Sequence, residues 1–408
     1  MEYTLLSKTY YADKEHYEEK YNSLKNGGFS TSLAFDIGKW EAFFVNLPEF
    51  NNVITKIYKG FSELQQLIHQ LPQVAYNQYA RKCLIDEIML TNDIEGIYST
   101  RKEIIDALEK NSDSSESQKR FEGLVKKYAL LLYENNKLIP LDSCQDIRDL
   151  YDEIVLSEVD ESKWPDGEIF RKEGVDVMSG TQQIKHSGLN PESKILEYMD
   201  IGLEILKNPD IPSIFKIAIF HYLMGYVHPF YDGNGRLSRF ISSYLLGQEF
   251  NSLVALRLSY TIKNQKNLYY KAFDICNDAK NRGDITHFII YFIEILNTSI
   301  ESLISRLSEG VNAINHYRGK LKYKYSMQSK ENEYCHDILW YLIQNALFST
   351  ERFSKEDLSH LVGASAITIS KYIEILQKDG VPITIGKSGR KNVYEIDLLA
   401  LDEYFDEL

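Results

Sequence analysis

Residues that break regular structure are scarce in this chain. It holds 9 prolines and 22 glycines among 408 residues, beside 29 tyrosines and 19 phenylalanines. With 44% hydrophobic and 26% charged residues, it is not collagen-like, mucin-like or disordered throughout. We expect a mainly α-helical fold, because so few breakers favour long helices over sheets with many turns. Typical domains have roughly 150 residues, so the length predicts two or three of them.

Cysteines and long apolar runs are also few. Cys83, Cys144, Cys276 and Cys335 form no CxxC pair, and thiols scattered in this way are expected to stay reduced in the cytosol. The N-terminal residues do not resemble a signal peptide. The longest apolar stretch, Phe288 to Leu296, is far shorter than the roughly 20 residues that a membrane span needs. We therefore expect a soluble, cytoplasmic protein with no membrane partner.

The chain has fewer basic than acidic residues. The chain has 46 Lys and Arg against 59 Asp and Glu, a net charge of −13. A surface of this kind repels phosphate backbones and anionic lipids on average. Any nucleotide or nucleic-acid site must therefore be a local feature.

The pattern of hydrophobic residues divides the chain into three regions. Residues 1–140 form an N-terminal helical region, whose first 38 residues are polar and read as an arm with little core of its own. A central helical region spans 141–318 and a C-terminal unit spans 331–408. A short β-hairpin is expected at about 174–188, around Ser179-Gly180-Thr181, as the only strand-like feature before residue 380.

The C-terminal unit has the element order of a winged helix-turn-helix domain. After a helix from Ile285 to Leu307 and a connector near 318–330, three helical segments precede two strands around Ile383 and Tyr394. Residues 331–408 hold 7 basic and 14 acidic side chains, whereas a DNA reader usually presents a basic face. We favour a protein-contact or dimerisation role for this unit, with DNA binding as the alternative.

The span 228–239, HPFYDGNGRLSR, concentrates residue types that act on phosphates. Pro229 ends the preceding helix and leaves His228 facing a loop. Gly233, Asn234 and Gly235 open the next helix, where backbone N–H groups and the helix dipole form an anion site.

Charged side chains complete this site. Arg236 and Arg239 lie three residues apart and suit bidentate phosphate contacts. Asp232 can hold Mg²⁺ while phosphate oxygens and water fill the other positions. His228 is the one group in the span that exchanges a proton near neutral pH. Each element alone is common in structural roles, but together they provide a base, a metal ligand, an anion site and two phosphate-binding arginines within twelve residues.

The span resembles the signature of the Fic family, HPFx[D/E]GNGRxxR, and matches it at every specified position. The resemblance implies a mostly helical core that transfers AMP from ATP to a hydroxyl side chain of a target protein. His228 would take the proton from that hydroxyl, and Asp232 would hold Mg²⁺ on the α- and β-phosphates. The remaining implied roles are phosphate support by Gly233, Asn234 and Gly235, binding of the β- and γ-phosphates by Arg236 and Arg239, and anchoring of the loop by Phe230.

Two further segments resemble the same family. The hairpin at 174–188 matches the family's flap in position, and the flap binds the target segment by strand addition. The pairs Tyr269-Tyr270 and Gly283-Asp284 resemble the downstream pattern, which implies that Tyr270 lies near the adenosine. The resemblance leaves open whether the protein modifies itself and whether it forms a homodimer.

The segment from Thr91 to Gly96, TNDIEG, resembles the family's inhibitory motif, [S/T]xxxE[G/N]. Thr91 and Glu95 are four residues apart on one helix face, and Gly96 suits the left-handed cap of that helix. The resemblance implies that Glu95 pairs with Arg239 in the place of the γ-phosphate. The sequence therefore predicts an adenylyltransferase that restrains itself.

Two alternatives remain beside this reading. In the first, Glu95 orients a water molecule and the protein removes AMP from modified targets. In the second, the winged helix dominates and the protein is a DNA-binding regulator, which the local charge disfavours.

Overall fold

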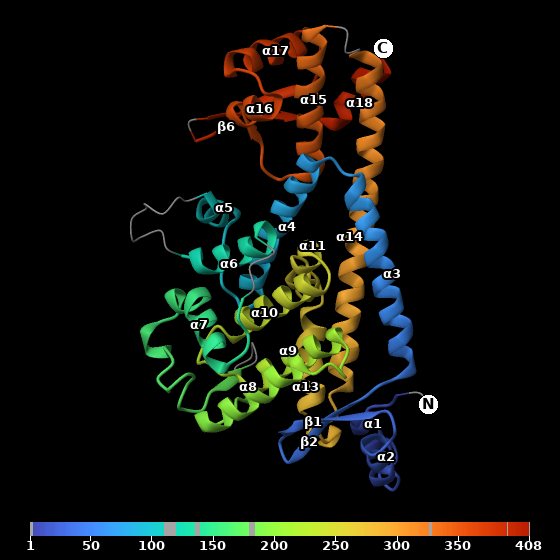
Figure 1. Cartoon of the computed structure of the whole chain (residues 1–408), viewed down its shortest axis with the longest axis vertical. Helices are drawn as coiled ribbons and strands as arrows, with labels where there is room; N and C mark the ends of the chain where they lie inside the picture. The colour runs from blue at the N-terminus through green and yellow to red at the C-terminus, as the bar shows by residue number, and fades with distance from the viewer. Residues whose placement is uncertain are drawn as a thin grey trace. The chain divides into compact units, whose positions relative to one another are not determined.

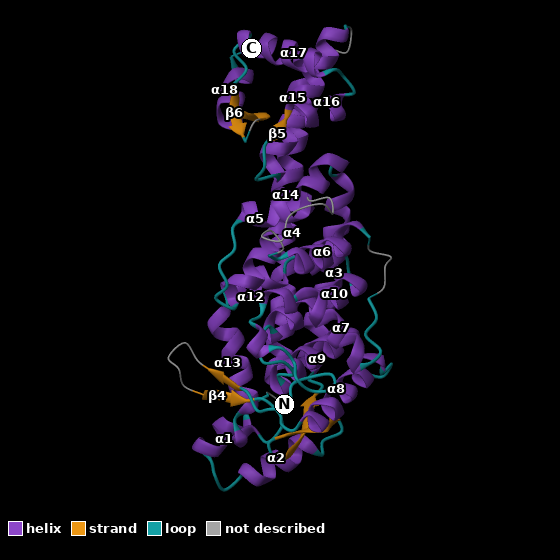
Figure 2. Ribbon diagram, turned by 90° about the vertical axis from the view of Figure 1, so that its left-hand side faces the viewer, coloured by secondary structure: helices purple, strands orange, loops and turns teal. Residues whose placement is uncertain are grey.

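The structure, a computed structural model, describes residues 3–109, 120–134, 139–178, 184–325, 329–389 and 391–407. Helices dominate these residues, and their strands are confined to small antiparallel sheets (Figure 2). The predicted mainly α-helical fold is therefore confirmed.

The chain divides into two compact units. The first contains Met1–Lys59 and Leu84–Ile300, and the second contains Gly60–Cys83 and Glu301–Leu408. Three long helices, which are labelled in Figure 1, have residues in both units. They are α3 (Pro48–Gln70), α4 (Gln73–Ile94) and α14 (Thr286–Lys324).

The first unit carries most of the helices. Besides its parts of α3, α4 and α14, its helices are α1 (Leu6–Ala12), α2 (Tyr17–Lys25), α5 (Arg101–Glu109), α6 (Glu122–Tyr133), α7 (Cys144–Ile154), α8 (Glu192–Lys207), α9 (Ser213–Val227), α10 (Asn234–Glu249), α11 (Ser252–Ala255), α12 (Leu258–Asn264) and α13 (Lys266–Asn277). Short 3₁₀ turns lie at η2 (Leu156–Glu158), η3 (Glu161–Lys163) and η4 (Ala279–Asn281). Its strands are β1 (Ser30–Ile37), β2 (Trp40–Val45), β3 (Asp176–Met178) and β4 (Ile184–Ser187).

The N-terminal segment is part of the folded unit, so the expectation of a polar arm was wrong. Strands β1 and β2 pair antiparallel, with Ser30 opposite Val45 and Ile37 opposite Trp40. Leu33, Phe35 and Ile37 are buried, and the residues between them are exposed. This alternation is typical of a half-buried strand, and the sequence reading overlooked it because polar neighbours surround it.

Helix α9 forms the centre of the first unit. It is apolar on all sides and nearly all of its side chains are buried, as expected for a helix enclosed by others. It packs against α8 and α10, and Figure 1 shows the three helices side by side. The loop between α9 and α10 contains the start of the span 228–239.

Helix α14 is longer than expected. The sequence predicted a helix ending at Leu307 and a connector near 318–330, but the helix continues to Lys324. By length and composition it is apolar enough to cross a membrane, and 56% of its apolar window is buried. A core helix of a soluble protein meets the same criteria, so this is weak evidence for a membrane span.

The second unit ends in a small mixed domain. Its elements are α15 (Lys330–Phe348), β5 (Phe353–Ser354), α16 (Lys355–Val362), α17 (Ala366–Lys378), β6 (Ile383–Ser388), β7 (Lys391–Ile396) and α18 (Leu398–Asp406). The strands form one antiparallel sheet in the order β5-β7-β6. Ser354 and Asp357 form a capping box at the start of α16. The three helices and two strands that the sequence predicted occur in the predicted order, whereas β5 and α18 were not predicted. Arg390 lies outside the described residues.

Candidate active site

The loop after α9 is held in one conformation by its own side chains. His228 ends the helix with a left-handed φ of 53°, and its N–H donates to the Met224 oxygen at 3.1 Å. The Phe230 ring is fully buried and stacks on Tyr151 at 3.7 Å between centroids. Asn234 accepts from the Phe230 N–H at 2.9 Å and donates to its oxygen at 2.7 Å. Asn234 thus braces the loop with its side chain, and Phe230 anchors it in the core.

The start of α10 is an uncapped helix N-terminus. Gly233 precedes it with a φ of 76°, and a Cβ at this position would lie 2.2 Å from Val155 Cγ1. Glycine is therefore required there for both conformation and space. Among the described residues no side chain caps this terminus. Its backbone N–H groups and the helix dipole consequently favour an anion.

Glu95 supplies a carboxylate at this terminus. Its Oε1 lies 2.7 Å from Arg239 Nη1, and a Cβ added at Gly235 would lie 2.1 Å from the same oxygen. Thr91 binds the same guanidinium twice, since Arg239 Nε donates to Thr91 Oγ1 at 2.8 Å and Nη2 to the Thr91 oxygen at 2.9 Å. The side chain of Arg239 is fully buried, whereas 31% of the Glu95 side chain is exposed.

Lysines of α12 and α13 bind the end of α4. Lys266 Nζ donates to the Ile94 oxygen at 2.6 Å, and Lys263 Nζ lies 2.5 Å from Asp93 Oδ2. Gly96 follows Glu95 with a φ of 76°, as expected for a left-handed helix cap. The fastened helix end and the glycine turn place Glu95 over the start of α10.

Arg236 has a different carboxylate partner. Its Nη1 lies 2.7 Å from Glu158 Oε2, and only 2% and 6% of the two side chains are exposed. Burial raises the pKa of Glu158, although Arg236 acts in the opposite direction. Among the described residues, Arg236 Nε and Glu158 Oε1 have no hydrogen-bond partner. The two arginines of the span thus contact separate acidic residues.

Asp232 lies beside the helix start with a cationic neighbour. Its Oδ1 accepts from the Gly233 N–H at 2.7 Å, and its Oδ2 lies 2.9 Å from Lys163 Nζ. Partial burial raises the pKa of Asp232, but Lys163 and the Gly233 N–H together bring it below its ordinary value.

The Asp232 carboxylate is a suitable ligand for a Mg²⁺ ion that binds together with a nucleotide. The described residues contain no cluster of three or more His, Cys, Asp or Glu side chains. Mg²⁺ commonly binds one carboxylate and takes its other ligands from substrate phosphates and water, so Asp232 beside an anion site suffices.

His228 is partly exposed, and its pKa is lower than that of a free histidine. Burial and the positive charge of Arg171 lower its pKa to about 4, and Glu95 acts in the opposite direction. The ring is therefore neutral at pH 7, which is the form that accepts a proton.

The two adjacent tyrosines lie in different environments. Tyr269 is buried, and its hydroxyl lies 2.8 Å from His221 Nε2. Tyr270 is 40% exposed, and its ring centroid lies 5.2 Å from that of Tyr269. Of the pair, Tyr270 is the one that is accessible to solvent.

The predicted hairpin is present in its described parts. Strands β3 and β4 pair antiparallel, with Asp176 opposite Ser187 and Val177 opposite His186. The expected turn Ser179-Gly180-Thr181 lies outside the described residues.

Sequence reasoning missed Glu158, Lys163, Arg171 and Lys266. Each is an isolated charged residue outside any motif, so its contact with the site becomes visible only once the chain is folded. The fully buried Arg171 is the least expected of them.

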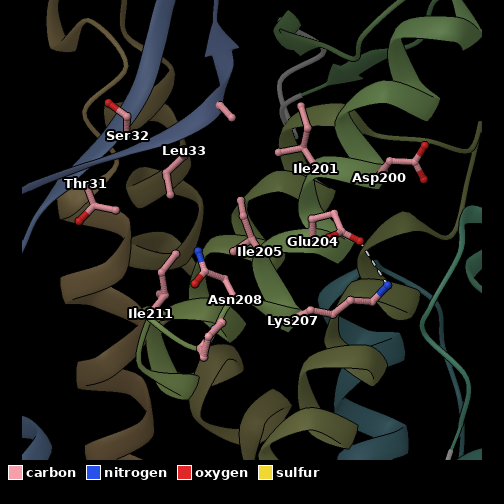
Figure 3. A pocket seen from close by; sticks show the side chains of 12 residues that line it. Thr31, Ser32, Leu33, Asp200, Ile201, Glu204, Ile205, Lys207, Asn208 and Ile211 are labelled. Carbon is pink, nitrogen blue, oxygen red and sulfur yellow. Dashed lines mark hydrogen bonds and ion pairs between the residues drawn. The ribbon is translucent and has the colours of Figure 1, made fainter.

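A separate groove in the first unit has none of these features. It has a volume of about 640 Å³ and lies between β1 and α8, lined by residues such as Leu33, Ile201 and Ile205 (Figure 3). Two of its charged side chains, Glu204 and Lys207, pair with each other at 3.3 Å. It contains no residue of the predicted site.

Comparisons with known proteins agree with the motif. Residues 140–246 match the model of the Fic/DOC family. An 84-residue stretch is 31% identical to a curated protein of Drosophila yakuba named protein adenylyltransferase Fic. That stretch covers 21% of this chain and 15% of the Drosophila protein, so only a small part of the curated relative is spanned.

A solved structure shares the fold. A Fic family protein from Desulfovibrio desulfuricans G20 is similar with a TM-score of 0.50 at 17% identity, over 84% of this chain and 96% of that one. Fic-1 from C. elegans matches with a TM-score of 0.42 at 19% identity, over 64% of this chain and 74% of that one. The family match and the Desulfovibrio fold confirm the predicted resemblance to the Fic family.

Proposed function

We propose that this chain, whose residues 140–246 match the Fic/DOC family model, is a protein adenylyltransferase. It transfers AMP from ATP to a Ser, Thr or Tyr hydroxyl of a target protein, and Glu95 restrains the reaction. The observation that carries the proposal is the Glu95 carboxylate at the start of α10, 2.7 Å from Arg239. A carboxylate there marks the place that a phosphate takes when the nucleotide binds.

In the proposed reaction His228 acts as the general base. Its pKa of about 4 keeps the imidazole neutral, so it accepts the proton of the target hydroxyl at neutral pH. The hydroxyl oxygen then forms a bond to the α-phosphorus, and the bond to pyrophosphate breaks. The loop braced by Asn234 and Phe230 keeps the imidazole in place, because misplaced groups lose much of their rate advantage.

The phosphates would be bound by groups fixed before the nucleotide arrives. The backbone N–H groups at Gly233, Asn234 and Gly235 would stabilise the charge that develops during transfer. Arg239 would bind the γ-phosphate after Glu95 leaves, and Asp232 would hold Mg²⁺ once Lys163 moves aside. When bound, Mg²⁺ supplies positive charge that stabilises the leaving pyrophosphate.

Partners follow from the surrounding elements. The target segment would add as a strand to the β3-β4 hairpin, and Tyr270 would contact the adenosine. The C-terminal elements from α15 to β7 would act as a winged helix that contacts protein, either a second copy or another chain. Excess acidic charge in residues 331–408 disfavours DNA.

A second candidate activity is hydrolysis of AMP from a modified protein. It is favoured by the charge of Glu95, which raises the pKa of His228, because a carboxylate near the base can orient water. Incubation with AMP-modified target separates the two activities, since removal of AMP would require Glu95 and transfer would not.

Mass spectrometry tests the proposed reaction. A lysate is incubated with ATP, Mg²⁺ and the Glu95→Gly protein, and with the Glu95→Gly/His228→Ala protein as the matched control. The proposal expects peptides carrying AMP on a hydroxyl side chain only in the first sample. A different adduct mass would overturn ATP as the donor, and no adduct in either sample would overturn the transferase assignment.

A further inference from the structure

Arg171 is a fully buried cation that binds backbone rather than carboxylates. Its Nε donates to the His228 oxygen at 2.9 Å, and its Nη2 donates to the Leu189 oxygen at 2.8 Å and the Val227 oxygen at 3.3 Å. Its Nη1 donates to the Glu173 oxygen. A buried guanidinium is costly unless its donors are satisfied, and here one side chain satisfies four carbonyls at once.

These four carbonyls belong to two functional segments. Val227 and His228 end α9 and begin the catalytic loop, while Glu173 and Leu189 flank the β3-β4 hairpin. The guanidinium fork therefore joins both ends of the hairpin to the backbone of the proposed base.

Backbone contacts run along the same junction. The Arg171 N–H donates to the Pro229 oxygen at 3.3 Å, and the Leu189 N–H donates to the Val227 oxygen at 3.1 Å. At Gly188 a Cβ would lie 2.5 Å from Arg171 Nη2 and 3.0 Å from His228 Cβ. The absence of a side chain at Gly188 allows the arginine and the histidine to approach this closely.

We infer that Arg171 is a positioning residue that keeps the His228 imidazole and the target-binding hairpin in a fixed relation. This inference rests on the proposed adenylyltransferase function. A target strand docked on the hairpin presents its hydroxyl at a distance from His228 that depends on this junction. A rigid junction matters because a misplacement of about 1 Å can cost on the order of 100-fold in rate.

Arg171 also contributes to the charge around His228. The groups that act on the imidazole are Arg171 and His186, which lower its pKa, and Glu95 and the Gly225 backbone, which raise it. Lysine at 171 retains the positive charge but lacks the planar fork, whereas methionine removes both. The two substitutions therefore separate geometry from charge.

The test uses the full-length Glu95→Gly protein as parent and measures transfer of labelled AMP to the protein itself. Arg171→Lys should lower the maximal rate on the order of 100-fold, while the KM for ATP stays within about twofold of the parent. Arg171→Met should lower the rate as much and also move the acidic limb of the pH–rate profile to higher pH, because the ring loses a positive neighbour.

Arg148→Lys is the matched control. Arg148 donates to the Ile169 oxygen at 2.9 Å and pairs with Asp152 at 2.8 Å, so it binds the same stretch of chain without touching the catalytic loop or the hairpin. Its rate should stay within about threefold of the parent, since a partly exposed pair contributes little.

Gly188→Ala gives a second way to disturb the junction while Arg171 is kept, and it should also lower the rate while ATP binding is retained. The inference is overturned if Arg171→Lys and Gly188→Ala transfer AMP as fast as Arg148→Lys. It is equally overturned if they lose ATP affinity and thermal stability in step with activity. A Glu95→Gly parent that transfers no AMP would instead contradict the proposed function.

Discussion

The two arginines of the span 228–239 differ in how their carboxylate partners are held. Both pairs have N–O distances of 2.7 Å. Glu158 is 6% exposed and lies opposite a buried Arg236, whereas Glu95 is 31% exposed and lies one residue beyond the end of α4. The distances are equal, so burial and chain position distinguish the pairs.

This difference indicates which carboxylate can leave. Separating a buried ion pair leaves an unpaired charge away from water, which is strongly destabilising. A carboxylate with access to water regains its hydration when it moves, so Glu95 can yield to a phosphate. In the proposed reaction Glu158 would therefore stay as a fixed partner of Arg236, and Glu95 would be the removable restraint on Arg239.

The largest expected effect is on stability. Glu158→Ala should lower the free energy of unfolding by about 3–5 kcal/mol, because it leaves Arg236 buried without its carboxylate. Glu95→Ala should lower it by less, about 1.5–3 kcal/mol, because Arg239 keeps its two hydrogen bonds to Thr91. In a Trp340→Phe background the urea transition is reported by Trp40 and Trp164 of the first unit. Equal losses in the two variants would break the comparison.

The next effect concerns a third carboxylate, Glu87, which lies on α4 about two turns before the helix end. It is fully buried, and burial raises its pKa to about 7, although the Ser259 N–H at 2.9 Å acts in the opposite direction. Its folded pKa exceeds the unfolded value, so its contribution to stability is complete below about pH 4.5 and is lost as pH rises through about 7.

Glu87→Gln should remove this dependence. The compared quantity is the free energy of unfolding of the variant minus that of the parent. This difference should rise in favour of the variant by on the order of 1–3 kcal/mol between pH 4.5 and pH 8. Urea unfolding of both proteins across this pH range measures it. A flat difference curve would show that burial does not protonate Glu87.

The smallest effect is expected at the most exposed contact. Lys163 and Asp232 are 53% and 45% exposed, so their pair contributes about 0–1 kcal/mol. Lys163→Ala should therefore tighten Mg²⁺ binding only about two- to fivefold. Calorimetric titration of Mg²⁺ into the Glu95→Gly/His228→Ala protein with ATP measures this, with Lys172→Ala as the control. Weaker binding in Lys163→Ala would mean that the lysine assists the metal instead of competing with it.

Local features of the site were predictable from the sequence. Pro229 ends α9 and leaves His228 at its end, and the glycines after Asp232 open α10. The helix end and the helix start depend on backbone preferences of neighbouring residues, which the sequence pattern indicates directly. The mainly helical fold follows from the same kind of evidence.

Contacts between distant segments were not predictable. The contacts that Glu158, Lys163 and Arg171 make with the site join segments that are far apart in the sequence. Glu158 and its partner Arg236, for example, are 78 residues apart. No periodicity or spacing marks them, because the pairing depends on how the helices pack. The β1-β2 hairpin was missed for a different reason, since its alternation of buried and exposed residues is present in the sequence but short.

Labelling with ATP carrying a tagged α-phosphate tests the central claim most directly. The wild-type, Glu95→Gly and Glu158→Gln proteins are compared side by side, with Glu95→Gly/His228→Ala as the inactive control. A charge-assisted contact contributes about 1.5–3 kcal/mol, so Glu95→Gly should incorporate roughly 10- to 100-fold more AMP than the wild type. Glu158→Gln should incorporate no more than the wild type. Equal labelling of the Glu95→Gly and wild-type proteins, or a gain in Glu158→Gln, would contradict the account.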